Sequence, residues 1–431
     1  MRTSFYTEIS DVSKFKCQLL QWSQSYNEIV YLDSNVENNN QKYLQYDLVV
    51  AVEAFTSIKT DYINSFQSLH QYQSQTKDWL FGYLSYDLKN DLEDLKSDNL
   101  DGLQFPDLFF FQPKKLFLLK DNLLEIHYLK MCDDELEFDF NQILNFKLQE
   151  NSSHHNVAIQ QRIKRADYLT KTTQMLAHIQ RGDIYEANFC MEFFAEKAII
   201  NPLQIYQKLN EISTAPNSVY FKNYTNFLLC ASPERYLKKI ESKIISQPIK
   251  GTAMRHENLK LDEKSKFELA NNQKERCENI MIVDLVRNDL SRTATKGSVK
   301  VEELCKIYSF KQVHQMISTI ISEIDTTAIA PIEVLQTTFP MGSMTGAPKI
   351  AAMKIIENLE ETKRGLYSGA VGYFDPNSNF DFNVVIRSIL YNSKNQYLSF
   401  SVGSAITAEA IPENEYEECL LKAKAMFAVL S

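Results

Sequence analysis

The first third of the chain carries short apolar runs separated by polar segments, the spacing expected of β-strands. This region is rich in Asn, Gln, Tyr and Phe and holds only two of the eleven glycines. Aromatic and β-branched residues in runs of this length, bounded by polar turns, favour strands over helices. We therefore predict a sheet-rich region over 1–148 with few helices, and strands over 48–55, 79–86, 108–111, 116–119 and 123–129.

A polar stretch over 149–156, QENSSHHN, is the best candidate for a linker or long loop. Beyond it, apolar residues recur at helical spacing over 163–180. Residues 367–406 read as antiparallel strands, SGAVGYF, FDFNVVIRSIL and YLSFSVGSAI, joined by polar turns. The stretch 412–430 starts with Pro and has acids first and lysines later, which is typical of a helix. We expect the second region, over 160–428, to carry the chemistry.

Composition excludes several classes of protein. The 431 residues are 44% hydrophobic and 23% charged, which is ordinary globular composition. The net charge is −9 and no dense basic run occurs, so we expect no nucleic-acid partner and a few placed cations for any anionic ligand. No run approaches the roughly 18 apolar residues that span a bilayer, and the first residues lack an apolar h-region, so we expect no signal peptide. Seven scattered cysteines without a C-x-x-C pair favour free thiols, so we predict a cytoplasmic protein with no membrane partner.

Lys250 and Glu234 form one candidate pair for chemistry, since each lies within two residues of a proline, with a short predicted strand over 243–245 between them. From spacing alone an exposed lysine is the simpler interpretation. Burial among its apolar neighbours would instead lower the pKa of the amine and make it a nucleophile, whereas nearby carboxylates and a bound dianion would raise that pKa. Nucleophilic attack requires some net depression.

Two further segments offer ligands. On a helix, Glu275 and Glu278 lie one turn apart on one face, and two close carboxylates suit Mg²⁺, although a solvated acidic turn is the alternative. Glu418 lies near a predicted helix start, where acids also complement the dipole. The segment FPMGSMTGAPK (339–349) predicts a tight turn before a helix over 350–359, a natural anion site that lacks the residue order of a P-loop.

In order along the chain, these segments resemble blocks of the chorismate-utilising enzymes, a family that includes anthranilate synthase component I, aminodeoxychorismate synthase component I and the isochorismate and salicylate synthases. Any one block is weak, but nine in the family's order cover roughly residues 160–428. FGYLSYDL (81–88) also looks like the amino-transferring branches. The blocks are GDIYEANF (182–189), SPER (232–235), PIKGTAMR (248–255), ENIMIVDLVRNDLSR (278–292), FPMGSMTGAPKIAAMKIIE (339–357), RGLYSGAVGYF (364–374), VVIRS (384–388), VGSAIT (402–407) and ENEYEECLLKAKAM (413–426).

The resemblance implies a two-lobed α/β (α+β) fold, with facing, mostly antiparallel sheets flanked by helices and with chorismate and Mg²⁺ bound between them. By position, Glu278 and Glu418 would bind Mg²⁺, with Glu275 close by. Tyr367 and Arg387 would hold the enolpyruvyl carboxylate, a task that suits a planar guanidinium. The other implied substrate-binding residues are Lys422, Ser343, Gly251, Thr252, Gly403, Ser404 and Ala405, the last standing where the family usually has a second glycine.

Three positions separate the branches of this family. Lys250 stands where the anthranilate branch has alanine, and lysine there marks the aminodeoxychorismate branch. Glu186 stands where the water-adding branches carry a base lysine and the amino-transferring relatives usually carry Gln, which argues against water addition. Pro216-Asn-Ser218 replaces the Pro-Tyr-Met-like triplet of the tryptophan-inhibited synthases, which argues against tryptophan feedback.

The resemblance therefore favours the aminodeoxychorismate branch, which makes 4-amino-4-deoxychorismate from chorismate and ammonia for p-aminobenzoate and folate synthesis. Lys250 would attack C2 of the ring while Glu234 protonates the departing C4 hydroxyl, and ammonia would then expel Lys250. His314 matches an active-site histidine, for which we expect hydrogen bonding or proton transfer. No cysteine lies in a glycine-flanked nucleophile elbow, so we expect ammonia to come from a glutamine amidotransferase subunit.

Two alternatives stay open at this point. The first is the anthranilate synthase component I branch, which Lys250 separates. The second is a non-catalytic relative that binds chorismate or a partner, against which the retention of Lys250, Arg387, Glu278 and Glu418 together argues.

Overall fold

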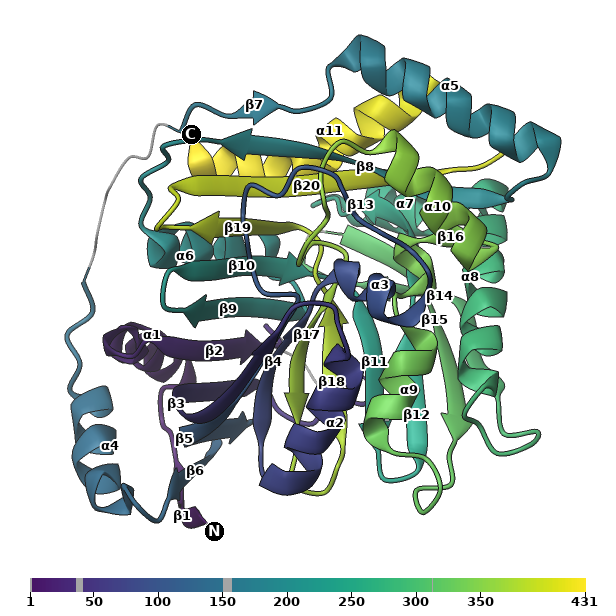
Figure 1. The fold of residues 1–431 in the computed structure, drawn as a ribbon. Coiled ribbons are helices and arrows are strands. Elements are labelled where there is room, and N and C mark those ends of the chain that lie inside the picture. Colours follow the sequence, from purple (N-terminus) through teal and green to yellow (C-terminus); the bar gives the residue numbers. More distant parts are fainter. Residues whose placement is uncertain (1, 36–41, 150–156, 312) are drawn as a thin grey trace.

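Two branches of antiparallel sheet, joined at one long strand, form the frame of the molecule (Figure 1). The computed structural model describes residues 2–35, 42–149, 157–311 and 313–431. The shared strand is β5 (Leu108–Lys120), whose first residues pair with β4 (Leu80–Leu84) and whose last residues pair with β6 (Leu123–Leu129). Within the described residues every ladder is antiparallel, and one isolated parallel bridge joins Leu100 to Thr362.

The strands of each branch follow one another by pairing. The first branch runs through β1 (Arg2–Glu8), β6, β5, β3 (Leu48–Thr60), β2 (Glu28–Asp33), β9 (Asn217–Asn223), β10 (Asn226–Ser232), β19 (Ser388–Asn392), β20 (Tyr397–Ile406) and β8 (Glu186–Ala195), which also pairs with β7 (Gln160–Gln161) and β16 (Gly346–Ala347). The second runs through β4, β17 (Ala370–Phe374), β18 (Phe380–Val384), β11 (Arg235–Ile240), β12 (Lys243–Gln247) and β15 (Val313–Glu323), which also pairs with β13 (Ile249–Met254) and β14 (Lys300–Ser309).

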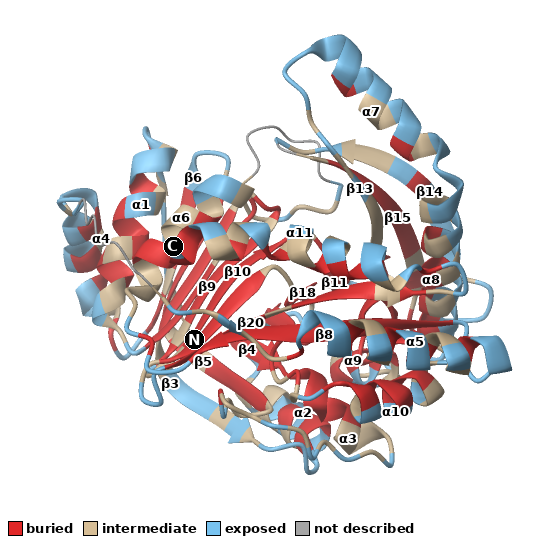
Figure 2. Ribbon diagram, turned by 90° about the horizontal axis from the view of Figure 1, so that it is seen from above, coloured by how far each residue is buried: buried red, intermediate tan, exposed pale blue. Residues whose placement is uncertain are grey.

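Helices cover the outer sides of these branches. Those on the first branch are α1 (Val12–Trp22), α4 (Leu136–Leu144), α5 (Arg165–Arg181), α6 (Pro202–Ser213), α10 (Lys349–Leu359) and α11 (Pro412–Leu430). The others are α2 (Ser65–Thr76), α3 (Lys89–Leu92), α7 (Leu259–Asn271), α8 (Gln273–Ser291) and α9 (Pro331–Thr338). In Figure 2, β13, β14 and β15 extend with the largely exposed α7 beyond the buried centre. Across the described residues, every helix falls short of the length and apolar character that crossing a membrane requires.

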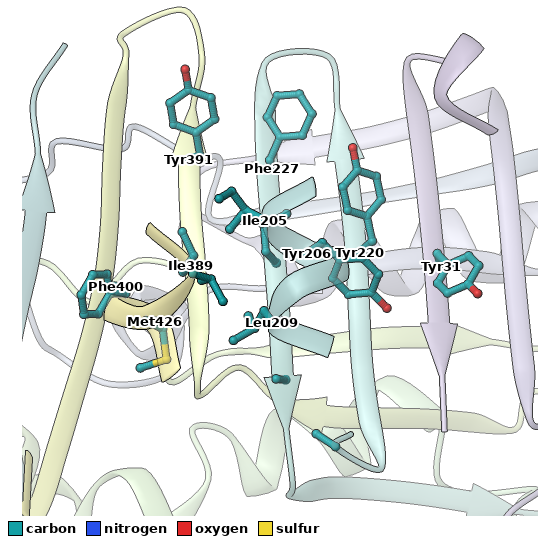
Figure 3. Close-up of a cluster of buried hydrophobic side chains, with 14 of the residues drawn as sticks. Tyr31, Ile205, Tyr206, Leu209, Tyr220, Phe227, Ile389, Tyr391, Phe400 and Met426 are labelled. Atoms are coloured by element: carbon teal, nitrogen blue, oxygen red, sulfur yellow. The ribbon is translucent and has the colours of Figure 1, made fainter. Parts of the chain in front are cut away.

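Several strands of the first branch, such as β2 and β8, are buried on both faces, which explains why the sequence shows continuous apolar runs there. In β2, Ile29 and Tyr31 belong to the apolar cluster beneath the helices, whereas Val30 between them belongs to the cluster that faces the second branch. Figure 3 shows the helix-side cluster, in which side chains of α6, such as Tyr206, and Met426 of α11 lie over the strands.

The second apolar cluster joins the inner faces of the two branches. Leu228 of β10 contributes to it from the first branch, and Val371 and Phe382 contribute from the second. The two branches therefore face each other across one core. The predicted α/β (α+β) class, with facing antiparallel sheets flanked by helices, is confirmed. All seven cysteines are free thiols, as expected.

Most predicted elements are present, but three expectations need correction. The predicted C-terminal helix has the bounds of α11, whereas α1, α2 and α4 contradict the expectation of few helices before residue 148. The runs 108–111 and 116–119 form one strand, β5. The run 380–390 forms two strands, because Arg387 adopts φ +52 and breaks the extended backbone.

The predicted linker, 149–156, lies outside the described residues except for Gln149. Hydrogen-bonded ladders nevertheless join the two predicted regions, since β2 pairs with β9 and β4 pairs with β17. The strands before residue 148 thus belong to the same sheet framework as those after residue 160.

Candidate active site

Charged side chains from β8, β13, α8 and α11 act on one another electrostatically at one end of the facing sheets. The carboxylates of Glu186 and Glu278 raise the pKa of Lys250 in β13. Both Lys250 and Lys422 in turn act to lower the pKa of Glu418 in α11. Residues separated by more than 200 positions in the sequence are therefore brought together, and they include both predicted metal ligands and the predicted nucleophile.

Lys250 is largely buried, with 10% of its side chain exposed, and its Nζ lies 3.1 Å from Oε1 of Glu186. Burial lowers the pKa of Lys250, but the carboxylates of Glu186, Glu278 and Glu234 outweigh burial and raise it. The net direction is the reverse of the depression that nucleophilic attack requires. Lys250 is therefore held as an ammonium ion, and a proton must leave it before it can attack.

Glu234 is buried, 5% exposed, just before β11. Burial raises the pKa of its carboxyl group to about 7, against smaller opposing effects of Ser343 and Lys250. The Ser343 hydroxyl and the Ile249 backbone N–H both donate hydrogen bonds to this carboxylate. Glu234 is thus fixed next to the strand that carries Lys250, and its pKa suits a group that donates a proton near neutral pH.

A second carboxylate group lies on α8, beside the backbone of β13. Gly251 has φ +89, and a Cβ there would lie 3.1 Å from Oε2 of Glu275, so glycine permits both the backbone conformation and the close approach. Burial raises the pKa of Glu278 to about 7, and Glu275 adds to this effect. Burial acts to raise the pKa of Glu418, but Lys422, together with Lys274 and Lys250, outweighs burial, so the net direction is downward.

These carboxylates fit a hard divalent cation. Oε1 of Glu278 is buried and has no hydrogen-bond partner among the described residues, and carboxylate oxygen is the ligand that Mg²⁺ prefers. The charge of Glu418 acts to raise the pKa of Glu275, as a close like charge does. In the described part of the chain, no three His, Cys, Asp or Glu residues stand at metal-binding spacing. Mg²⁺ sites commonly use one or two carboxylates together with water and substrate oxygens.

Arg387 is a cation without a side-chain hydrogen bond or ion pair to any described residue. It lies between β18 and β19, where its positive φ turns the chain, and burial lowers the pKa of its guanidinium. The nearest charged and phenolic groups that act on it are Tyr367 and Glu418. Tyr367 is buried, 4% exposed, and burial raises the pKa of its phenol, so it remains a hydrogen-bond donor. A partly buried guanidinium beside a phenol is well suited to bind a carboxylate.

Lys422 and the end of β20 lie on the same side of the site. Lys422 Nζ donates to the Gly403 carbonyl at 2.8 Å and pairs with Glu418 at 2.6 Å. The pairing of β20 with β19 stops at Ser399, so Gly403, Ser404 and Ala405 pair with β8 on one edge only. The Ser404 side chain is within hydrogen-bonding distance of Tyr168, which leaves backbone groups as the available contacts there.

Three further residues of the predicted segments have the following surroundings. His314 is 1% exposed, and its ring nitrogens lie 2.8 Å from Ser309 Oγ and 3.0 Å from Asp262 Oδ1. Thr252 is exposed on β13. Lys349, in the predicted anion-binding turn, instead pairs with Asp289 at 2.6 Å. Neither nitrogen of His314 is therefore free for a substrate, and a role in holding Asp262 fits this geometry better.

Sequence reasoning missed two partners at the site. Lys274 bridges α8 and α11, with Nζ 3.5 Å from Glu415 and 3.8 Å from Glu278. Ser343, predicted to contact substrate, also hydrogen-bonds Glu234, a contact that the sequence did not indicate. Glu415 is 2% exposed although it lies in a predicted solvated helix start, and no local pattern signals its burial.

The fold and this site define a class of protein, and comparison with known families agrees with them. The profile of the family described as chorismate binding enzyme matches residues 27–428. The chain therefore belongs to this family.

Individual relatives come from two branches. The chain is 35% identical over 357 residues to an anthranilate synthase component I-like protein of Synechocystis, covering 82% of this chain and 72% of the relative. It is 30% identical to aminodeoxychorismate synthase component 1 of Bacillus subtilis, covering 80% of this chain and 75% of the relative. It is also 32% identical over 384 residues to the probable chloroplastic aminodeoxychorismate synthase of rice, of which it covers 42%.

Solved structures share the fold at lower identity. Anthranilate synthase component I of Streptococcus pneumoniae superposes with a TM-score of 0.77 at 22% identity, covering 91% of this chain and 95% of its own. The menaquinone-specific isochorismate synthase of Escherichia coli gives a TM-score of 0.78 at 14% identity, covering 100% of this chain and 94% of its own.

Proposed function

We propose that this chain is the synthase component that converts chorismate and ammonia to 4-amino-4-deoxychorismate, with Lys250 as the covalent nucleophile. The observation that carries the proposal is a buried amine beside a buried carboxyl group, Glu234, whose pKa burial raises to about 7. Replacing the C4 hydroxyl of chorismate needs a group that attacks the ring and an acid that protonates the leaving oxygen. Relatives named aminodeoxychorismate synthase support the same branch.

In the first half-reaction, the Nζ–C2 bond forms as the ring π-electrons shift from C1=C2 to C1=C6 and from C5=C6 to C4=C5. The C4–O bond breaks, and Glu234 donates its proton so that the hydroxyl leaves as water. In the second half-reaction, ammonia bonds to C4 and the electrons return. The C2–N bond then breaks, and Lys250 leaves as a neutral amine.

Substrate binding falls to separate groups. Arg387 and Tyr367 would hold the enolpyruvyl carboxylate, since the guanidinium has no partner among the described residues and the phenol stays protonated. Glu278 and Glu418 would hold Mg²⁺, with Glu275 close by. When bound, Mg²⁺ neutralises the ring carboxylate and makes C2 more electrophilic. Backbone groups of Gly251 and of Gly403, Ser404 and Ala405 would line the remaining side, with Lys422 near the ring carboxylate.

Ammonia is proposed to come from a glutamine amidotransferase partner. The cysteines Cys132, Cys190, Cys230, Cys305 and Cys419 are buried, so none of these offers an accessible thiolate for glutamine hydrolysis. The chain alone should use ammonium at alkaline pH but not glutamine, and an added glutaminase subunit should restore glutamine use. Glutamine-dependent turnover by the chain alone would contradict this part of the proposal.

The test of the nucleophile uses two variants. Lys250→Ala removes both amine and charge, and Lys250→Arg keeps a cation opposite Glu186 but cannot attack the ring. Both should bind chorismate and lose most 4-amino product, and Lys250→Ala is also expected to divert ammonia to C2. Wild type mixed with chorismate and Mg²⁺ but no ammonia should show an adduct on the Lys250 peptide by mass spectrometry.

Two outcomes would reject covalent catalysis together. One is the lack of any adduct on the Lys250 peptide, and the other is unimpaired 4-amino product from Lys250→Ala. Formation of the 2-amino product by wild type would instead assign the chain to the anthranilate branch.

A further inference from the structure

Glu186 and Lys250 form an ion pair in the interior of the site. The Glu186 side chain is 2% exposed at the start of β8, and its Oε1 lies 3.1 Å from Lys250 Nζ. Its second oxygen, Oε2, is buried without a hydrogen-bond partner among the described residues. Lys250 is thus the one described donor that reaches this carboxylate.

Hydrogen bonds to β16 hold the backbone around Glu186 in place. Ala347 of β16 pairs with Glu186, and the Tyr185 backbone N–H donates to the Ala347 carbonyl at 2.7 Å. A Cβ at Gly346 would overlap the Glu186 carbonyl oxygen, so the two strands approach each other closely. The backbone that carries the carboxylate is therefore held in place, and the ion pair with Lys250 orients the carboxylate itself.

Other charged groups surround the same amine from each neighbouring element. Glu278 of α8 and Glu234 before β11 both act on Lys250. The charge of Lys250 also acts to lower the pKa of Glu275 in α8 and of Glu418 in α11. Glu186 is the only one of these five carboxylates that forms an ion pair with Nζ in the described residues. The others therefore favour the ammonium form without receiving its proton directly.

We propose that Glu186 is the proton acceptor that converts the Lys250 ammonium ion to the attacking amine and later returns the proton. This inference rests on the proposed function, because it assigns a base to the Lys250 step of that reaction. A glutamate here differs from both the lysine and the glutamine that the family resemblance leads one to expect.

The proton balance closes with this assignment. The Lys250 N–H bond breaks and an O–H bond forms on Glu186, which leaves a neutral amine and a neutral carboxyl group. The amine then bonds to C2, while Glu234 separately supplies the proton for the departing hydroxyl. After ammonia expels neutral Lys250, Glu186 gives the proton back. No oxidant or further reactant is required.

The test relies on the pH dependence of adduct formation. Internal transfer within the Glu186–Lys250 pair leaves its total number of protons unchanged, so it adds no pH dependence while the pair holds one proton. In Glu186→Gln the amide can accept a hydrogen bond but not the proton, so solvent must deprotonate Lys250. The rate should then rise about tenfold per pH unit below the pKa of Lys250, as follows from the fraction of neutral amine.

The assay is a single-turnover measurement of the Lys250 adduct, with chorismate and Mg²⁺ but without ammonia, between pH 6 and pH 8. Omitting ammonia removes its own titration from the profile. Glu234 serves as the acid in both proteins, so its effect cancels in the ratio of wild-type to variant rates. At pH 7 we expect the variant to be slower by about 10²- to 10⁴-fold, the usual contribution of a general base.

Two more variants separate a proton acceptor from a merely structural ion pair. Glu192→Gln removes another buried carboxylate of β8, one that bonds Arg162, Tyr397 and Ser399 and does not contact Lys250. It should leave the shape of the pH profile unchanged. Glu186→Asp keeps a carboxylate, so its profile should run parallel to that of wild type at a lower rate.

Each outcome decides the matter. A wild-type to Glu186→Gln ratio that is constant from pH 6 to pH 8 would overturn the inference while leaving Lys250 as the nucleophile. A Glu186→Asp profile that rises with pH as in Glu186→Gln would also overturn it. Absence of any wild-type adduct at every pH would reject the covalent mechanism itself and this inference with it.

Discussion

Removing the Ser343 hydroxyl should shift the pH range over which Glu234 can act as an acid. Ser343 donates a hydrogen bond to the Glu234 carboxylate, and this bond partly offsets the burial that raises the pKa of Glu234 to about 7. In Ser343→Ala the ionised carboxylate loses a donor while the protonated form loses less. The pKa of Glu234 should therefore rise, and the group should stay protonated to higher pH.

The size of the shift follows from the bond that is lost. A hydrogen bond to a charged group contributes roughly 1.5–3 kcal/mol, and 1.36 kcal/mol corresponds to about one pKa unit. Because the protonated carboxyl also uses part of that bond, we expect a shift near the lower end, about one unit. At pH 8 the protonated fraction would then rise from about a tenth to about a half, roughly a fivefold gain relative to the maximum of each protein.

The assay is the rate of Lys250 adduct formation without ammonia, measured from pH 6 to pH 9 and scaled to each protein's maximum. Ser246→Ala is a matched control, because Ser246 borders the same cavity as Glu234 but donates to the Tyr236 carbonyl. The alkaline limb should move upward in Ser343→Ala and stay in place in Ser246→Ala. An unmoved limb in Ser343→Ala, or equal shifts in both variants, would refute the role given to Glu234.

Three further predictions test other parts of the site. Glu278→Gln should abolish Mg²⁺-dependent turnover without lowering the melting temperature at pH 8. The pKa of this carboxyl group is raised to about 7, so it is harder to ionise in the folded than in the unfolded chain, and its charge destabilises the fold at pH 8. Retained activity at low Mg²⁺ would contradict its role. Arg387→Lys should weaken chorismate binding by about tenfold or more, measured by calorimetry, because an ammonium cannot reproduce a bidentate guanidinium contact; unchanged affinity would remove Arg387 from the site. Arg364→Met should lower the free energy of unfolding in urea by about 3–5 kcal/mol, because it leaves buried Glu360 unpaired; a loss below about 1 kcal/mol would show that the pair is not structural.

Sequence reasoning predicted best the elements whose pattern is local. The helix α11 has a proline at its start and acids in its first turn, signals that act within a few residues, and its predicted bounds are correct. The buried first part of β3, residues 48–52, is a continuous apolar run that can be identified without knowledge of its partners. Helix α2 was missed because its buried residues, such as Phe66 and Leu69, are few and lie among polar ones.

Features that depend on tertiary contacts escaped prediction. The break at Arg387 lies inside an apolar run that reads as one strand, and the strands on its two sides, β18 and β19, pair with different neighbours. The contact between Glu186 and Lys250 spans 64 residues, so no spacing rule anticipates it. The direction of the pKa of Lys250 depends on carboxylates from β8 and α8 together.

The groups that pair with a cation indicate its role better than its position in a motif does. They distinguish cations that could bind substrate, cations that could react and cations that stabilise the fold. In a protein of net charge −9, many cations are paired with neighbouring carboxylates. Lys349 is paired with Asp289 and serves the fold, although it lies in a segment that looks like an anion site. Lys250 is paired with a buried carboxylate that can take its proton, which suits a nucleophile. Arg387, without a partner among the described residues, cannot lose its proton at physiological pH and keeps its full charge for an anionic ligand. Within the proposed function, these different partners assign Arg387 to substrate binding and Lys250 to the covalent step.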